Sequence, residues 1–174
     1  MLFKQVVSHQ SLLDNRVTRS KLKEMSINLA LFPTPFKKIY YFPTPEERKA
    51  TTIDNPALVL RKVITAYLDT DKFYYSCRTA EERWAIKWQP IGYIHVVNTV
   101  LSRTINLKAR IERNEARKTR RAKRIANILS LYGNKIIFHK VKSIEGAKFR
   151  RTPYGAYALR SQIRKDKKRF REKI

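Results

Sequence analysis

Arginine recurs at spacings of three and four residues in one segment, in the series Arg110, Arg113, Arg117, Arg120, Arg121 and Arg124. A helix with this spacing presents arginine over much of its circumference. The guanidinium group suits phosphate because its planar fork donates two hydrogen bonds at once and its charge does not titrate away. A solvated charged helix is the alternative, but residues 103–124 hold ten basic side chains against two acidic ones. The series therefore predicts contact with a nucleic-acid backbone.

Aromatic and basic side chains are interleaved in a second segment. The basic residues are Lys148, Arg150 and Arg151, and the aromatic residues among them are Phe149, Tyr154 and Tyr157. Such rings can stack on unpaired bases, which indicates single-stranded or looped RNA. They can equally pack on the core of the protein itself, so both interpretations stay open.

The net charge of +25 is concentrated in the second part of the chain. Residues 103–174 contain 24 Lys/Arg and 5 Asp/Glu, whereas residues 1–102 contain 15 and 9. So much like charge repels itself unless a polyanion neutralises it, which favours RNA as the partner. Besides the arginine series, the expected RNA-binding residues are Arg103, Lys108, Lys118, Lys123, Lys148, Arg150, Arg151, Arg160, Arg164, Lys165, Lys167, Lys168, Arg169 and Arg171.

Other kinds of chemistry have little support in the sequence. His9, His95 and His139 are far apart and none has a metal-type spacing to another His or to Cys77. Carboxylates are scarce where the charge is, so we expect no enzyme, no metal site, no cofactor and no small-molecule substrate. A single cysteine excludes an internal disulfide and indicates a reducing compartment. The sequence contains no run of about 18 apolar residues, so it predicts no membrane span.

The apolar pattern predicts helices over residues 12–31, 56–69 and 79–88. Asn55 and Pro56 begin the second helix, and Thr79 with Glu82 forms a capping-box pattern for the third. A short strand is expected over 72–77. The residues expected in the core are Leu60, Val63, Tyr67, Trp84 and Trp88.

A repeated Phe-Pro-Thr-Pro tetrapeptide, at residues 32–35 and 42–45, predicts an extended Pro-rich strap over 32–46. The strap either packs on the core of this chain or docks on a neighbouring protein. Residues 91–131 contain no proline, and Gly92 is their only glycine, so they predict one helix about 60 Å long, with a break near Asn106 as the principal alternative. A strand is expected over 135–142. The basic run 160–174 is expected to be helical when bound and disordered when free.

These elements predict a mainly α protein with one long basic helix, a short strand segment and a basic C-terminal extension. Residues 1–102 are expected to form a helical packing domain, and residues 103–174 an RNA-binding part.

We therefore expect an RNA-binding structural subunit of a ribonucleoprotein, and specifically a ribosomal protein of the mitochondrial matrix. Its partners would be ribosomal RNA and neighbouring ribosomal proteins. The first 23 residues, with five basic residues and a single aspartate, have the composition of an organellar address. The alternative is a helix-turn-helix DNA-binding protein, in which residues 79–88 form the first helix and a helix from Tyr93 is the reader. Against it, residues 93–101 are apolar rather than base-reading.

Overall fold

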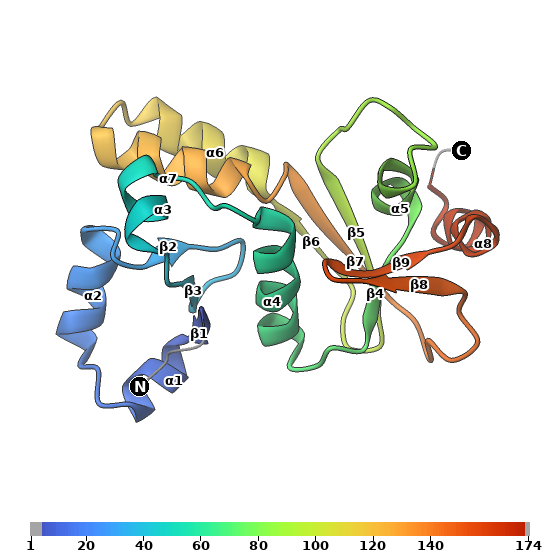
Figure 1. Cartoon of the computed structure of the whole chain (residues 1–174), viewed down its shortest axis with the longest axis horizontal. Coiled ribbons are helices and arrows are strands. Elements are labelled where there is room, and N and C mark those ends of the chain that lie inside the picture. The colour runs from blue at the N-terminus through green and yellow to red at the C-terminus, as the bar shows by residue number, and fades with distance from the viewer. Residues whose placement is uncertain (1–4, 173–174) are drawn as a thin grey trace. The chain divides into compact units, whose positions relative to one another are not determined.

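The computed structural model describes residues 5–172, and the chain forms two compact units (Figure 1). Unit 1 comprises Met1–Asp69 and Ala109–Tyr132, and unit 2 comprises Thr70–Lys108 and Gly133–Ile174. The chain thus crosses between the units several times, instead of dividing once after residue 102 as the charge distribution suggests. Residues 1–4 of the expected address and residues 173–174 of the C-terminal basic run lie outside the described residues.

Unit 1 is built from a small antiparallel sheet and surrounding helices. Its strands have the order β1-β3-β2, and Tyr41 of β3 pairs with Val6 of β1 and Phe32 of β2. The elements are β1 (Val6–Ser8), α1 (His9–Asp14), α2 (Arg19–Ile27), β2 (Phe32–Pro33), β3 (Ile39–Tyr41), α3 (Pro45–Ala50), α4 (Pro56–Leu68), α6 (Leu107–Ala116, of which all but the first two residues belong to unit 1) and α7 (Arg120–Ser130).

Local signals place α4 as expected. The side chain of Asn55 accepts a hydrogen bond from the Leu58 amide, Pro56 occupies the first turn, and Asp69 ends the helix in a left-handed conformation. Its buried face consists of Val59, Leu60, Val63, Ile64 and Leu68. The single helix expected over 12–31 is wrong, because Arg16 takes a left-handed conformation and Thr18 caps a second helix there.

The Pro-rich strap packs on unit 1 itself. It contains β2 and β3, and Phe32, Phe36 and Tyr41 are all buried. Inside its loop, the buried Thr34 hydroxyl donates to the carbonyl of Ile39 at 2.8 Å. These three aromatic side chains therefore anchor the strap in the core of the unit.

Unit 2 contains a six-stranded mixed sheet with the strand order β6-β7-β5-β4-β9-β8. The β5–β7 and β4–β9 pairs are parallel and the other pairs are antiparallel. Helices α5 and α8 contact each other and the sheet, with Tyr74, Ala80, Val97, Ala158 and Ile163 in the core beneath them. The elements are β4 (Phe73–Tyr75), α5 (Cys77–Arg83), β5 (Tyr93–Asn98), β6 (Arg103–Asn106), β7 (Lys135–Lys140), β8 (Phe149–Thr152), β9 (Gly155–Ala158) and α8 (Arg160–Phe170).

The structure is an α/β fold with 43% helix and 21% strand, so the mainly α prediction is wrong. The long helix expected over residues 91–131 is replaced by β5, β6, α6 and α7. The apolar spacing there fits a helix, but Ile94, Val96 and Val97 are β-branched and lie in a strand that is paired on both sides. A break does occur at Asn106, where β6 ends. The strands expected near 72–77 and 135–142 are confirmed as β4 and β7.

The helix expected over 79–88 begins two residues earlier, at Cys77, and ends at Arg83. Thr79 does not cap it, because its hydroxyl donates to the Tyr93 carbonyl and accepts from the His95 amide. Trp84 is half-buried, but Trp88 is 85% exposed, so its placement in the core is wrong.

The helix-turn-helix alternative requires a reader helix from Tyr93, and that segment is strand β5. This part of the DNA-binding hypothesis is therefore wrong. Within residues 5–172, no helix has both the length and the apolar character needed to cross a membrane.

Candidate nucleic-acid interface

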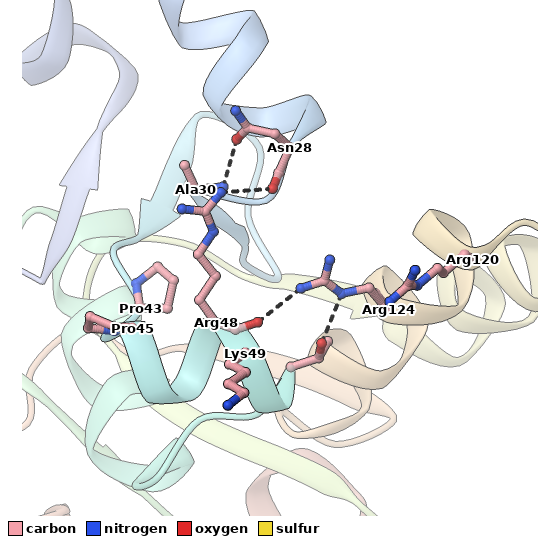
Figure 2. A pocket seen from close by; sticks show the side chains of 9 residues that line it. Asn28, Ala30, Pro43, Pro45, Arg48, Lys49, Arg120 and Arg124 are labelled. Atoms are coloured by element: carbon pink, nitrogen blue, oxygen red, sulfur yellow. Dashed lines mark hydrogen bonds between the residues drawn. The ribbon is translucent and has the colours of Figure 1, made fainter.

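A basic concavity lies in unit 1 between helices α3 and α7 (Figure 2). Arg48 and Lys49 reach it from α3, and Arg120 and Arg124 reach it from α7. The remaining walls are Asn28, Ala30, Pro43, Pro45 and Thr51, and the volume is about 680 Å³. Four cationic side chains and no carboxylate are thus found among the described residues that line it.

Helix α7 directs its cations outward because its other face is buried. Ala122, Ala126, Ile128 and Leu129 pack inward, while Arg120 is exposed. The side chain of Thr119 caps the helix by accepting a hydrogen bond from the Ala122 amide at 3.1 Å. The first turn has basic residues and no acidic one, although the helix dipole is positive at this end. A bound anion would relieve this repulsion.

Helix α3 is held by a capping box between Thr44 and Glu47. The carboxylate of Glu47 is turned inward, where it accepts hydrogen bonds from the Tyr41 hydroxyl and from the Thr44 and Asp54 amides. Burial, and then the hydrogen bond to Glu47, raises the pKa of Tyr41 well above its ordinary value. The Glu47 carboxylate is therefore used by hydrogen bonds inside unit 1 and does not face the concavity. Helix α3 contributes the cations Arg48 and Lys49 to the concavity and no carboxylate.

Hydrogen bonds fix two of the four cations. Arg124 donates from Nε to the Thr51 hydroxyl at 2.8 Å and from Nη2 to the Arg48 carbonyl at 2.9 Å (Figure 2). Arg48 donates in turn to the Asn28 carbonyl at 3.4 Å. Arg120 and Lys49 make no side-chain hydrogen bond to another described residue. The site thus combines two positioned guanidinium groups with two cations whose donors are available to a ligand.

Not every arginine of the series serves this surface. Arg110 donates from Nη1 to the Pro35 carbonyl at 2.6 Å, and burial, followed by repulsion from Arg113, lowers its pKa. Arg121 donates to the carbonyls at the end of α2, from Nε to Ile27 at 3.0 Å. Both side chains therefore tie elements of unit 1 together. The exposed predicted residues of this segment are Arg113, Arg117, Lys118, Arg120, Arg121 and Lys123.

The residues of unit 2 that the sequence predicts to bind RNA are exposed, with one exception. Lys167 is buried and forms an ion pair with Glu81, with Nζ and Oε1 2.9 Å apart. The exposed ones are Arg103 and Lys108, then Lys148, Arg150 and Arg151, and on or next to α8 Arg160, Arg164, Lys165, Lys168, Arg169 and Arg171. They are thus distributed over the two edge strands of the sheet, β6 and β8, and over helix α8 and the segments next to these elements.

The aromatic residues among these cations pack on unit 2. Phe149 stacks on Tyr74, with ring centroids 5.4 Å apart, and Tyr157 is buried. Tyr154 is half-buried beneath Arg83, whose guanidinium lies 5.3 Å from the ring centroid. Of the two interpretations left open by the sequence, packing on the core describes Phe149 and Tyr157.

Sequence reasoning missed two kinds of residue. Arg48 and Lys49 lie in a short helix whose Thr44–Glu47 capping box was available as a signal. Cys77, His95 and His139, which come together in unit 2 and could hold a metal ion, are 18 and 44 residues apart in sequence and gave no such signal. Their proximity depends on strand pairing.

Comparisons of the chain with protein-family models, curated proteins and solved structures find no match. Function therefore has to be inferred from the geometry of the site. The concavity offers guanidinium and ammonium donors, and its one hydroxyl, on Thr51, is hydrogen-bonded to Arg124. This set of groups suits the binding of phosphate oxygens rather than their chemical transformation.

Proposed function

We propose that the chain binds the phosphate backbone of RNA, with the concavity between α3 and α7 as its primary contact. The single observation that carries the proposal is the convergence of Arg48, Lys49, Arg120 and Arg124 on one open concavity. Two of these guanidinium groups are held by hydrogen bonds before any ligand arrives, so less side-chain entropy is lost on binding.

The exposed cations of unit 2 provide further phosphate contacts in this proposal. Those of β8 and α8 lie on folded elements and can each neutralise phosphates of a large polyanion. Distributed backbone contact is typical of proteins that position RNA rather than read its sequence. We therefore propose a structural subunit of a ribonucleoprotein, specifically of the mitochondrial ribosome, with ribosomal RNA and neighbouring ribosomal proteins as its partners.

The decisive test removes charge from the concavity without removing internal hydrogen bonds. The variant Arg120→Gln/Lys49→Gln loses two cations that make no side-chain hydrogen bond to another described residue. A matched control is Arg19→Gln/Lys23→Gln, which removes one arginine and one lysine from exposed positions on α2 that do not line the concavity. Binding to structured RNA, single-stranded RNA and duplex DNA is measured by fluorescence anisotropy between 50 and 300 mM salt.

Loss of the two cations should weaken RNA binding and lower the slope of log affinity against log salt. Each lost phosphate contact changes this slope by about 0.7–0.9, so the double variant should change it by about 1.4–1.8. The control should bind RNA like the unchanged protein. Equal losses for the two variants, or preferential binding to duplex DNA, would contradict the proposal.

Assignment to the mitochondrial ribosome is tested in mitochondrial lysates. The full chain should sediment with one ribosomal subunit on a sucrose gradient and should leave that fraction after RNase treatment but not after DNase treatment. Sedimentation as a free protein, or release by DNase, would contradict this assignment.

A further inference from the structure

Unit 2 brings together one thiol and two imidazoles from three separate elements. Cys77 is the first residue of α5, His95 lies in β5, and His139 lies in β7. One donor atom from each residue lies within 4.8 Å of the others. Nδ1 of His95 and Nε2 of His139 are 3.0 Å apart, and the two rings stack with an interplanar angle of 7°.

Strand pairing in the sheet and the helix that follows β4 bring these three residues together. In the parallel β5–β7 pair, Val97 is opposite His139, so His95 and His139 point to the same face two positions apart. Cys77 reaches that face because α5 follows β4 directly, and the Ser76 amide donates to the His95 carbonyl at 3.1 Å. Phe170 of α8 stacks on the His139 ring at 4.0 Å and limits its rotation. The three donors are thus held in place by backbone pairing and helix packing.

These groups are buried as well as close. Cys77 and His95 are each 1% exposed, and His139 is half-buried. Burial disfavours the charged form of an imidazole. Neutral imidazole is the form that binds a metal ion.

A cavity of about 460 Å³ adjoins the cluster and opens a route to it. Cys77 and His95 line it, together with Glu81, Lys167 and Glu172. Oε1 of Glu172 lies 3.8 Å from Nδ1 of His95. Oε2 of Glu81 is buried and has no hydrogen-bond partner among the described residues, because its other oxygen takes the ion pair with Lys167. A buried carboxylate oxygen without a hydrogen-bond partner is costly, so a ligand in the cavity that donates a hydrogen bond to it is favoured.

We propose that Cys77, His95 and His139 bind one divalent transition-metal ion, zinc by the match of its ligands, with the fourth coordination position facing this cavity. Zinc takes thiolate and imidazole ligands, and one Cys with two His is an established three-residue set for an ion that keeps an open position. Two nitrogens bound tetrahedrally at about 2.0–2.1 Å lie about 3.3–3.4 Å apart. The two imidazole nitrogens therefore need to separate by only a few tenths of an ångström.

Proton balance on binding is simple. In the metal-free protein one imidazole donates across the 3.0 Å contact, and on binding that ring transfers its proton to its other nitrogen. The thiol of Cys77 releases one proton to solvent as the metal-bound thiolate forms. The ion then joins the start of α5 to β5 and β7.

The test uses the untagged full chain, stripped with a chelator and then loaded with one equivalent of Zn²⁺ or Co²⁺. Elemental analysis after gel filtration should find about one zinc per chain, and zinc should raise the melting temperature. The cobalt form should show the visible bands of a tetrahedral ion and a near-ultraviolet thiolate-to-cobalt band. Cys77→Ser should remove the thiolate band and weaken zinc binding at least about tenfold.

His9→Gln is the matched control, because His9 is the remaining histidine of the chain and lies in unit 1. It should retain both cobalt bands and the zinc stoichiometry. Circular dichroism of the stripped Cys77→Ser protein checks that loss of binding is not loss of fold, and His139→Gln provides a second variant that should also lose the ion. No bound zinc at one equivalent, or a cobalt spectrum that Cys77→Ser leaves unchanged, would overturn the proposal.

Discussion

Asp166 anchors α8 to the sheet of unit 2, and its replacement by alanine should strongly destabilise that unit. The carboxylate is 3% exposed and accepts hydrogen bonds from the Ser76 hydroxyl at 2.6 Å and the Tyr74 hydroxyl at 3.1 Å. It also accepts one from Nε2 of Gln162 at 2.9 Å. These contacts join a helix rich in cations to strand β4 and the residue that follows it.

The magnitude follows from what the substitution leaves behind. Asp166→Ala strands two buried hydroxyl groups, and each unsatisfied buried polar group costs about 1–3 kcal/mol. Tyr74 keeps a weak contact with Gln162 at 3.4 Å, which places its share at the lower end. The free energy of unfolding should therefore fall by about 2–4 kcal/mol. Asp166→Asn keeps the shape and one acceptor, and should cost about half as much.

Both tryptophans lie in unit 2, so urea unfolding followed by tryptophan fluorescence reports on this unit. Lys165→Ala is the control, because Lys165 is the exposed neighbour of Asp166 on the same helix and its loss should change stability by less than about 0.5 kcal/mol. A loss below about 1 kcal/mol for Asp166→Ala would refute the reasoning. It would mean that α8 is not docked through this carboxylate and is disordered in the free protein, as the sequence alone suggests.

Three further predictions concern contacts within one unit or the other. Arg110→Ala should destabilise unit 1 by about 1–3 kcal/mol, because two carbonyls of the strap lose a charged donor, and circular dichroism melting measures this loss. The same substitution should change the salt dependence of RNA binding, measured by anisotropy, less than loss of the concavity cations does. Trp84→Ala should cost about 2–4 kcal/mol because its indole N–H donates to a buried carbonyl, whereas the exposed Trp88→Ala should leave urea unfolding unchanged. Glu47→Gln should destabilise unit 1 by about 2–4 kcal/mol and speed hydrogen exchange of the amides bonded to that carboxylate; unchanged exchange would argue against the capping box.

Local signals correctly predicted α4, β4 and β7. Helix α4 begins and ends where Asn55, Pro56 and Asp69 indicate, because capping depends on side chains and amides within a few residues of one another. Strand β7 coincides with the run after Gly133 that contains β-branched isoleucines, and such residues favour strands. The positive charge of residues 103–174 is a property of composition, and two of the residues predicted from it, Arg120 and Arg124, line the concavity.

Local signals do not predict which strands pair with one another. Strand β5 carries apolar residues at a spacing that also fits a helix, and it is a strand because β4 and β7 bond to it from either side. Its pairing with β7 joins residues about 40 positions apart, such as Tyr93 and Lys135. No short window of sequence contains that information, so the mainly α prediction failed at this point.

The same distinction separates the arginines and assembles the buried cluster. Arg110 and Arg120 belong to the same arginine series in the sequence. Arg110 donates to carbonyls of the strap, whereas Arg120 lines the open concavity, because packing decides which side of a helix is covered. Cys77, His95 and His139 meet only through the register of three strands and the helix that follows one of them. Composition and local capping were determined by the sequence itself, whereas the direction of each cation and the meeting of distant donors were decided by tertiary contacts, since both depend on residues far away along the chain.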